Sequence, residues 1–232
     1  EINSDKIHPK AHFVHITTNN TIERTYFPDV LDTKDVPLVA DMSSNILSQP
    51  YDIQKFGLIY AGAQKNLGPA GLTIVIVRDD LVGYAMAECP TMLNLQTHVK
   101  GKSLYNTPPA YSIYIAKLVL EWLKDFGGIE KMYKQNKQKA AMLYDFIDQS
   151  KLFSSPVEKS ARSLMNVPFV LPTDELNQQF IQEATANGFV NLKGHRSVGG
   201  MRASIYNAMP VEGVQALIQF MQQFENQVQG AK

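Results

Sequence analysis

The sequence has little cysteine, no charge excess and no long apolar run, and each shortage excludes a class of protein. Its 232 residues contain a single cysteine, Cys89, so no disulfide can form within the chain. Lysine plus arginine equals aspartate plus glutamate at 22 each, which leaves no basic excess to bind nucleic acid or acidic lipid. The longest apolar stretch, residues 72–77, is far shorter than the roughly 20 residues that cross a bilayer.

Signals for secretion and for metal binding are also missing. No charged-then-apolar signal segment opens the chain, so a reducing cytoplasm is the expected location. The histidines, among them His8, His12, His15 and His98, do not have the spacing of metal ligands. We therefore expect a cytoplasmic protein with no metal, no nucleic-acid partner and no membrane partner.

Short apolar runs in the first half predict strands. Residues 38–40 are apolar and end at Asp41, residues 72–77 are rich in β-branched side chains, and residues 58–60 form a third run. Runs of this kind are typical of strands buried on both faces of a sheet, and we expect this for residues 38–40 and 72–77. The pattern indicates an α/β layer.

The second half alternates helical and strand-like text. A helix is predicted after "YNTPPAY" and up to the glycine pair at 127–128, and another over residues 129–147, whose basic side chains we expect on a solvated face: Lys131, Lys134, Lys137 and Lys139. A strand in 163–171, a helix from 173 or 174 to before Gly188, a strand in 201–208 and a last helix after Pro210 follow. Residues 1–126 and 127–232 are therefore predicted to be two domains, the second of them small and α+β.

One lysine stands in an unusual frame, the segment "GAQKNLGPAG" at residues 62–71. Lys65 precedes Gly68 and is followed by Asn66, so the spacing is not that of a nucleotide-binding P-loop. A lysine among small residues suits a Schiff base with an aldehyde cofactor, because the neighbours leave room for a flat ring. Such a lysine can equally be an incidental turn residue.

The same chemistry needs a carboxylate to keep the pyridine nitrogen of pyridoxal phosphate protonated. Asp41, at the carboxyl end of an apolar run, has the position at which α/β sheets bind ligands. It can also cap the following turn with Ser43 and Ser44, and its spacing alone favours that simpler interpretation.

Three longer stretches decide more than spacing does: "ADMSSNILSQPYDIQKFGLIYAGAQKNLGPAGLTIVIVRDDLVG", "LYNTPPAYSIYIAKLVLEWLK" and "LKGHRSVGGMRASIYNAMPVEGV". Together they closely resemble the phosphoserine aminotransferase family, fold-type I pyridoxal phosphate enzymes of serine biosynthesis. The resemblance implies that residues 1–126 are the C-terminal part of a large mixed-sheet cofactor domain and residues 127–232 a small α+β domain. Family members are about half as long again at the amino end, so we expect a chain that lacks the N-terminal third.

The resemblance also implies roles for the residues that bind the cofactor, pyridoxal phosphate. Lys65 becomes the lysine that holds its aldehyde carbon and moves a proton, and Asp41 pairs with its ring nitrogen. Gln64 matches a contact to its phosphate, and Thr21, in "NNTIER", matches a threonine near its ring. In the same motif the family usually has glycine where this chain has Arg24.

Further residues are implied for a homodimer that shares its active sites. Asn106 and Thr107, in "YNTPP", match residues that reach the cofactor phosphate of the neighbouring subunit, although this segment also reads as an ordinary turn. Arg202 matches the residue that holds the substrate α-carboxylate. His195 and Arg196 resemble the pair that receives the side-chain phosphate of the substrate.

The implied reaction transfers an amino group between L-glutamate and 3-phosphohydroxypyruvate, giving O-phospho-L-serine and 2-oxoglutarate. In bacteria the family is also connected with pyridoxine synthesis. Two alternatives stay open. The chain is a non-catalytic fragment of such an enzyme, or it is another fold-type I enzyme, such as a desulfurase or a different small aminotransferase.

Overall fold

The computed structural model describes residues 7–8 and 10–230, which form two compact units. The described residues of the first unit come from Glu1–Thr18, Asp29–Ser43 and Tyr51–Trp122. The second unit comprises residues from Asn19–Pro28, Ser44–Pro50 and Leu123–Lys232. The predicted domains, residues 1–126 and 127–232, stay a prediction.

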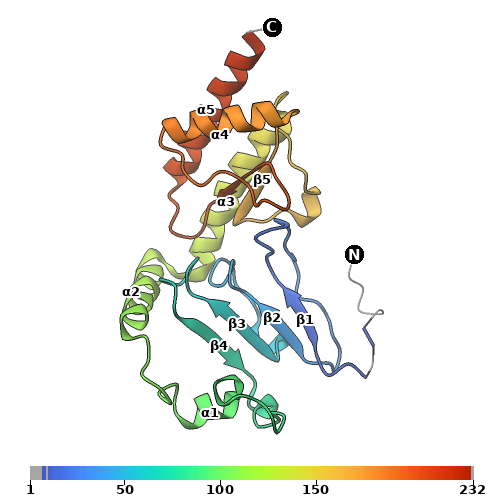
Figure 1. The fold of residues 1–232 in the computed structure, drawn as a ribbon, viewed down its shortest axis with the longest axis vertical. Coiled ribbons are helices and arrows are strands. Elements are labelled where there is room, and N and C mark those ends of the chain that lie inside the picture. The colour runs from blue at the N-terminus through green and yellow to red at the C-terminus, as the bar shows by residue number, and fades with distance from the viewer. Residues whose placement is uncertain (1–6, 9, 231–232) are drawn as a thin grey trace. The chain divides into compact units, whose positions relative to one another are not determined.

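A four-stranded mixed sheet forms the centre of the first unit (Figure 1). Its strands, in spatial and sequence order, are β1 (Val14–Thr17), β2 (Leu38–Asp41), β3 (Leu58–Gly62) and β4 (Thr73–Val77). The first three are parallel, and β4 runs antiparallel to β3. The strands predicted from residues 38–40, 58–60 and 72–77 are thereby confirmed, whereas β1 is an addition.

The sheet buries one face, so the prediction that residues 38–40 and 72–77 are buried on both faces is wrong. In β2, Leu38 and Ala40 are buried while Val39 and Asp41 are half-buried, as period-two alternation requires. In β4, Val75 is 44% and Ile76 43% exposed, while Ile74 and Val77 are half-buried. Because β4 pairs with β3 alone among the described strands, it is an edge strand of this sheet.

Short helical segments and one long helix complete the first unit. The 3-10 helices are η2 (Ile53–Lys55), η3 (Asp79–Leu81) and η4 (Thr91–Leu93), and the α-helices are α1 (Leu95–Lys100) and α2 (Ala110–Phe126), of which residues up to 122 group with this unit. Prolines 108 and 109 precede α2, and the helix ends before the glycine pair 127–128, as predicted. The six-residue α1, capped by the Asn94 side chain on the amide of Gln96, has too little periodicity to be found from sequence.

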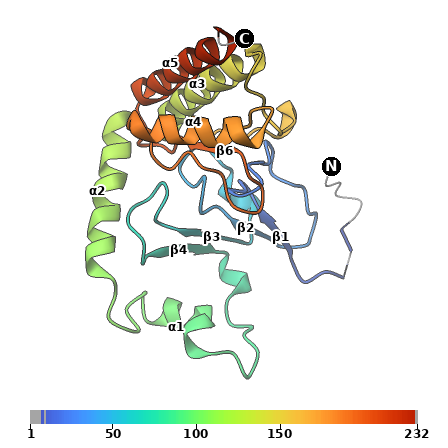
Figure 2. The ribbon, with the colours of Figure 1, turned by 45° about the horizontal axis from the view of Figure 1, so that its top comes forward.

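The second unit packs three helices against a two-stranded antiparallel sheet (Figure 2). Its elements are α3 (Gly128–Gln149), η5 (Lys159–Ala161), β5 (Asn166–Phe169), α4 (Asp174–Ala186), β6 (Met201–Ser204) and α5 (Val211–Gly230). The Thr173 hydroxyl accepts a hydrogen bond from the Leu176 amide and caps α4, which confirms the predicted start of that helix.

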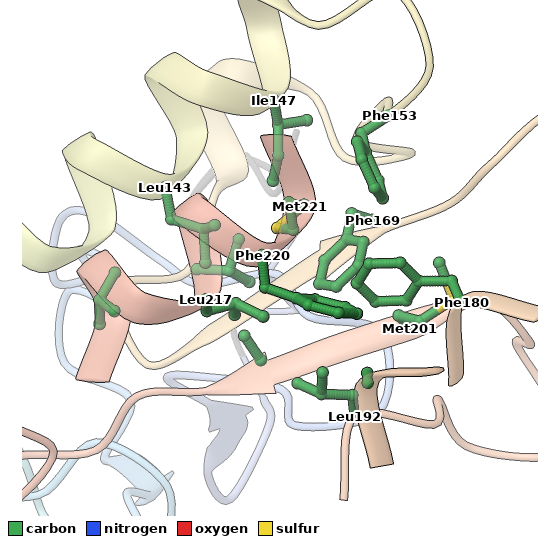
Figure 3. Packing of buried hydrophobic residues seen from close by; sticks show 14 of the residues in the cluster. Leu143, Ile147, Phe153, Phe169, Phe180, Leu192, Met201, Leu217, Phe220 and Met221 are labelled. Atoms are coloured by element: carbon green, nitrogen blue, oxygen red, sulfur yellow. The ribbon is translucent and has the colours of Figure 1, made fainter. Parts of the chain in front are cut away.

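Aromatic side chains from distant segments form the core of this unit (Figure 3). Phe180 of α4 lies at their centre, fully buried, with ring centroids 5.2 to 5.7 Å from those of Phe153, Phe169, Phe220 and Phe224. Edge-to-face and tilted pairs of this kind add to the stabilisation that comes from burying apolar area. The core therefore fixes β5 and β6, and with β6 the position of Arg202.

The predicted solvated basic face of α3 is wrong at one residue, Lys139, which has no exposed surface. Its ammonium group donates hydrogen bonds to the carbonyl oxygens of Ile205, Tyr206 and Met209, at 3.2, 2.9 and 3.0 Å. The residue lies on the buried stripe of α3, where a lysine is tolerated because three backbone acceptors satisfy it.

Among residues 7–8 and 10–230, no helix is long and apolar enough to span a membrane.

Candidate active site

Two chemically important residues of the first unit lie at the same edge of its sheet. Asp41 is the last residue of β2, and Lys65 follows the end of β3 by three positions. Because β2 and β3 are parallel neighbours, their carboxyl ends meet at one edge, where α/β sheets bind ligands. Both side chains are half-buried, and Gln64 beside them is exposed.

Small residues allow the lysine loop to fold tightly. The Leu67 and Gly68 amides both donate to the Ala63 carbonyl, at 3.1 and 2.8 Å. A Cβ on Gly68 would lie 3.4 Å from the Cα of Ala116 in α2, and one on Gly62 would lie 2.7 Å from Gln64 Oε1. The two backbone hydrogen bonds to Ala63 therefore close the loop that carries Lys65, and at Gly68 it lies in van der Waals contact with α2.

The turn-capping contact that the sequence allowed for Asp41 is present. Its Oδ1 accepts a hydrogen bond from the Ser43 amide at 2.8 Å, which is the turn-capping contact. Its backbone carbonyl accepts from the Thr18 amide and hydroxyl, at 3.0 and 3.1 Å, so the residue is held by β1 as well as by its own turn. These contacts position the carboxylate and leave it acceptor sites for a further partner.

Sequence reasoning missed two neighbours of Asp41. Tyr60 stands opposite Asp41 in the parallel register, and burial, the Asp41 charge and a hydrogen bond to Asp41 together raise the pKa of its phenol. His15 Nε2 lies 3.0 Å from the Tyr60 hydroxyl. The missing signal was the register, because alternation within each strand does not reveal which residues of β2 and β3 lie opposite one another.

Asn106 and Thr107 lie in an exposed segment before α2. The Asn106 side chain donates to the Thr107 carbonyl at 3.2 Å, a local contact typical of a turn. The turn interpretation therefore holds for this contact, while the exposed side chains remain accessible to a partner.

In the second unit, Arg202 of β6 is directed to the turn that contains Thr21. Its Nη1 donates to the Thr21 carbonyl at 3.2 Å and its Nε to the Ser204 hydroxyl at 3.2 Å. The structure thus brings together two residues that are far apart in sequence and that the sequence assigned to substrate and cofactor. The guanidinium is half-buried and keeps further donors for an anion.

His195 and Arg196 are exposed in the loop that precedes β6. His195 Nδ1 lies 2.7 Å from the Ser197 hydroxyl, and the His195 carbonyl accepts from the amides of Val198 and Gly199 at 3.0 and 2.8 Å. The loop backbone is therefore ordered by its own hydrogen bonds, and the two cationic side chains are open to solvent.

Other possible sites are less well formed. A hollow lined by residues 30–38, Gln54, Lys55 and Arg78 lies at the amino end of β2, away from Asp41. Within the described part of the chain, no three histidine, cysteine or acidic side chains are grouped so that they could hold a metal ion.

The first unit thus combines a lysine after one parallel strand, a carboxylate at the end of its neighbour and a mixed sheet. The chain belongs to this family, whose model, Aminotransferase class-V, matches residues 1–217.

The particular relatives are phosphoserine aminotransferases. The enzyme of that name from Bacillus cereus (strain ATCC 14579) is 64% identical over 216 residues, which are 93% of this chain and 60% of the relative. The solved phosphoserine aminotransferase of Bacillus circulans subsp. alkalophilus has a TM-score of 0.93 and 50% identity over 95% of this chain and 62% of its own. That of Trichomonas vaginalis, solved with pyridoxal phosphate bound, has a TM-score of 0.90 and 38% identity over 94% and 62%. The chain thus spans about three fifths of their length.

Proposed function

We propose that this chain carries the catalytic lysine and the substrate arginine of a phosphoserine aminotransferase. The reaction moves an amino group from L-glutamate to 3-phosphohydroxypyruvate and yields O-phospho-L-serine and 2-oxoglutarate. The main support is the meeting of Lys65 and Asp41 at one sheet edge, in a chain 64% identical to a protein of that name.

The residues at this edge fit pyridoxal phosphate. Lys65 offers a primary amine on a loop closed by backbone hydrogen bonds, and Asp41 offers a positioned carboxylate with acceptor capacity. When bound, the cofactor supplies an electron sink for the carbanion that forms at the substrate Cα. Gln64, Thr21, and the partner-directed Asn106 and Thr107 complete its proposed contacts.

The protein's own residues then have distinct tasks. Asp41 holds a proton at the ring nitrogen, and Tyr60 orients Asp41. The Lys65 amine takes the proton from the substrate Cα and returns it at the other reacting carbon, as a general base and then a general acid. Arg202 receives the α-carboxylate through its planar fork of donors.

A second copy of the chain is the proposed partner. Asn106, Thr107, His195 and Arg196 are exposed and make local contacts, which suits residues that complete a site across a dimer interface. His195 and Arg196 would receive the dianionic phosphate of the substrate. We place this activity in the cytoplasm, with serine synthesis as its main role and pyridoxine synthesis as a further one.

Covalent trapping tests the cofactor site directly. The protein is incubated with pyridoxal phosphate, reduced with borohydride and digested, and the modified peptide is identified by mass spectrometry. We expect one adduct on Lys65 that is lost in Lys65→Ala and kept in Lys55→Ala, a change at an exposed lysine of the same unit. Adducts scattered over surface lysines would contradict the proposed site.

Amino-donor specificity separates the remaining alternatives. Glutamate and O-phosphoserine, and not cysteine or alanine, should convert the bound cofactor to its amino form, which absorbs at shorter wavelength. Release of alanine from cysteine, with the cofactor left in its aldehyde form, would point to a desulfurase. An adduct on Lys65 without any conversion would favour a chain that binds the cofactor and does not catalyse.

A further inference from the structure

Arg24 has a position that is unfavourable for an arginine. Its backbone has a φ of 65°, in the left-handed region that glycine adopts at little cost. The turn is closed around it, since its amide donates to the Asn20 carbonyl at 2.7 Å and the Asn20 amide donates to the Thr25 carbonyl at 2.8 Å. The side chain is nevertheless 1% exposed, so both backbone strain and burial oppose this residue.

The buried guanidinium of Arg24 uses only part of its hydrogen-bonding capacity. Nη2 donates to the Gly199 carbonyl at 2.8 Å, and a Cβ on Gly194 would lie 2.5 Å from the same nitrogen. Nε and Nη1 are buried and have no hydrogen-bond partner among the described residues. An arginine stays charged in proteins, so these donors are costly unless an acceptor reaches them.

Arg202 is close enough to Arg24 for their charges to interact. Burial lowers the pKa of Arg24, the Arg202 charge lowers it further, and Glu23 raises it. Both arginines bond to backbone carbonyls, and Arg202 bonds to Thr21 in the turn that carries Arg24. The ion pairs found among residues 7–8 and 10–230 include neither of them.

We propose that Arg24 and Arg202 together bind one carboxylate, with Arg24 donating through Nε and Nη1. Two adjacent guanidinium groups repel one another, and an oxyanion that accepts from both removes this repulsion and satisfies the buried donors. Arg24 is therefore a second anchor for the carboxylate and increases the affinity of this site for carboxylate substrates. The identification of this carboxylate as the substrate's rests on the proposed function, whereas the binding of a carboxylate by the two arginines does not.

The test measures carboxylate binding without the cofactor. Calorimetry with 2-oxoglutarate is carried out on cofactor-free protein, on Arg24→Gly and on Arg24→Asn, a neutral residue that tolerates the same backbone conformation. Two charge-assisted hydrogen bonds are lost, so we expect Kd to rise about tenfold or more in both variants. Without ligand, Arg24→Gly should melt at a higher temperature than the parent, because strain and the buried donors are removed together.

A matched control separates backbone relief from binding. Lys34 also has a positive φ, 54°, and is exposed, so Lys34→Gly should relieve strain and leave Kd unchanged. An unchanged Kd in both Arg24 variants, a lower melting temperature of ligand-free Arg24→Gly, or a parent that prefers inorganic phosphate to 2-oxoglutarate would overturn the proposal. Lys65 trapping is independent of Arg24, so failure of the proposed function would be seen separately.

Discussion

At the scale of single residues, Tyr60 is the neighbour that we expect to orient the Asp41 carboxylate. We expect Tyr60→Phe to lower kcat about tenfold, because one hydrogen bond to a charged group contributes about 1.5 to 3 kcal/mol. The KM for glutamate should change little, since Arg202 lies in the other unit. The measurement is steady-state kinetics with glutamate and 3-phosphohydroxypyruvate, with covalent trapping on Lys65 as a check of cofactor binding.

His15→Gln is the control for this prediction, because an amide can keep the hydrogen bond to the Tyr60 hydroxyl that His15 now makes. Its kcat should stay within about twofold of the parent value, which corresponds to less than about 0.5 kcal/mol. Equal losses in the two variants would mean that packing at this face, and not orientation of Asp41, is what Tyr60 provides.

The sequence was sufficient for residues whose signal is local. Lys65 and Asp41 lie in one long stretch that resembles the family, so both could be proposed from the sequence, although spacing alone favoured a turn for Asp41. Tyr60 and Arg24 could not be assigned in this way. The contact of Tyr60 depends on strand register, and the burial of Arg24 depends on a loop 175 residues further along the chain. Neither can therefore be recognised from the adjacent residues in the sequence.

At the scale of elements, Lys139 links α3 to the segment between β6 and α5. Burial lowers the pKa of its ammonium to about 8, whereas an unfolded chain keeps the ordinary 10.5. Between these values the unfolded chain binds more protons, so the contribution of Lys139 to stability increases with pH; below pH 8 both states are protonated and the cost of burial is fully present.

Lys139→Met removes this dependence and also leaves three carbonyls without their donor. The variant should be less stable than the parent, and we expect this deficit to be about 2 to 3 kcal/mol larger at pH 10 than at pH 7. The reason is that the pKa of Lys139 differs between the folded and unfolded states. Urea unfolding of both proteins across this range measures it. A difference that does not change with pH would mean that the three carbonyls offset burial and keep the ammonium at its ordinary pKa.

Phe180 of α4 lies in the aromatic core of the second unit. Phe180→Ala should destabilise the protein by about 3 to 5 kcal/mol, because a fully buried ring is lost and leaves a cavity between Phe153, Phe169 and Phe224. Phe189→Ala, at the half-buried margin of the same cluster, should cost clearly less. Thermal unfolding compares them, and equal costs would contradict the central position of Phe180.

Element types were easier to predict than element surroundings. The long helices and the apolar strands were found because their periodicity is strong, while β1 and α1 are short and were missed. The burial of β4 was mispredicted since an apolar run does not reveal whether its strand is central or at an edge. In α3 the basic residues looked alike, and only the carbonyls near 205–209 distinguish Lys139 from the solvated ones.

At the scale of the whole molecule, apolar exposure is concentrated in the first unit. In α2, Tyr111 is 73% and Tyr114 57% exposed, and Leu118, Leu120 and Trp122 are also exposed. The segment before α2 adds Tyr84, Met86, Leu93, Leu104 and Tyr105. Exposed apolar side chains gathered in one unit are typical of interaction sites, and the balanced charge of the chain gives little repulsion to oppose association.

We therefore expect the protein to associate with itself at neutral pH through this face of α2. Tyr114 and Leu118 are four residues apart on one side of the helix, so Tyr114→Glu combined with Leu118→Lys makes an intrahelical ion pair and removes two apolar contacts. Sedimentation velocity over a hundredfold range of concentration should show a concentration-dependent mass for the parent and a monomer for the double variant. Lys117→Glu, which changes charge at an exposed polar position of the same helix, should behave as the parent does. A parent that is a monomer throughout would contradict self-association, and a double variant that retains the mass of the parent would mean that the surface joining the copies lies elsewhere.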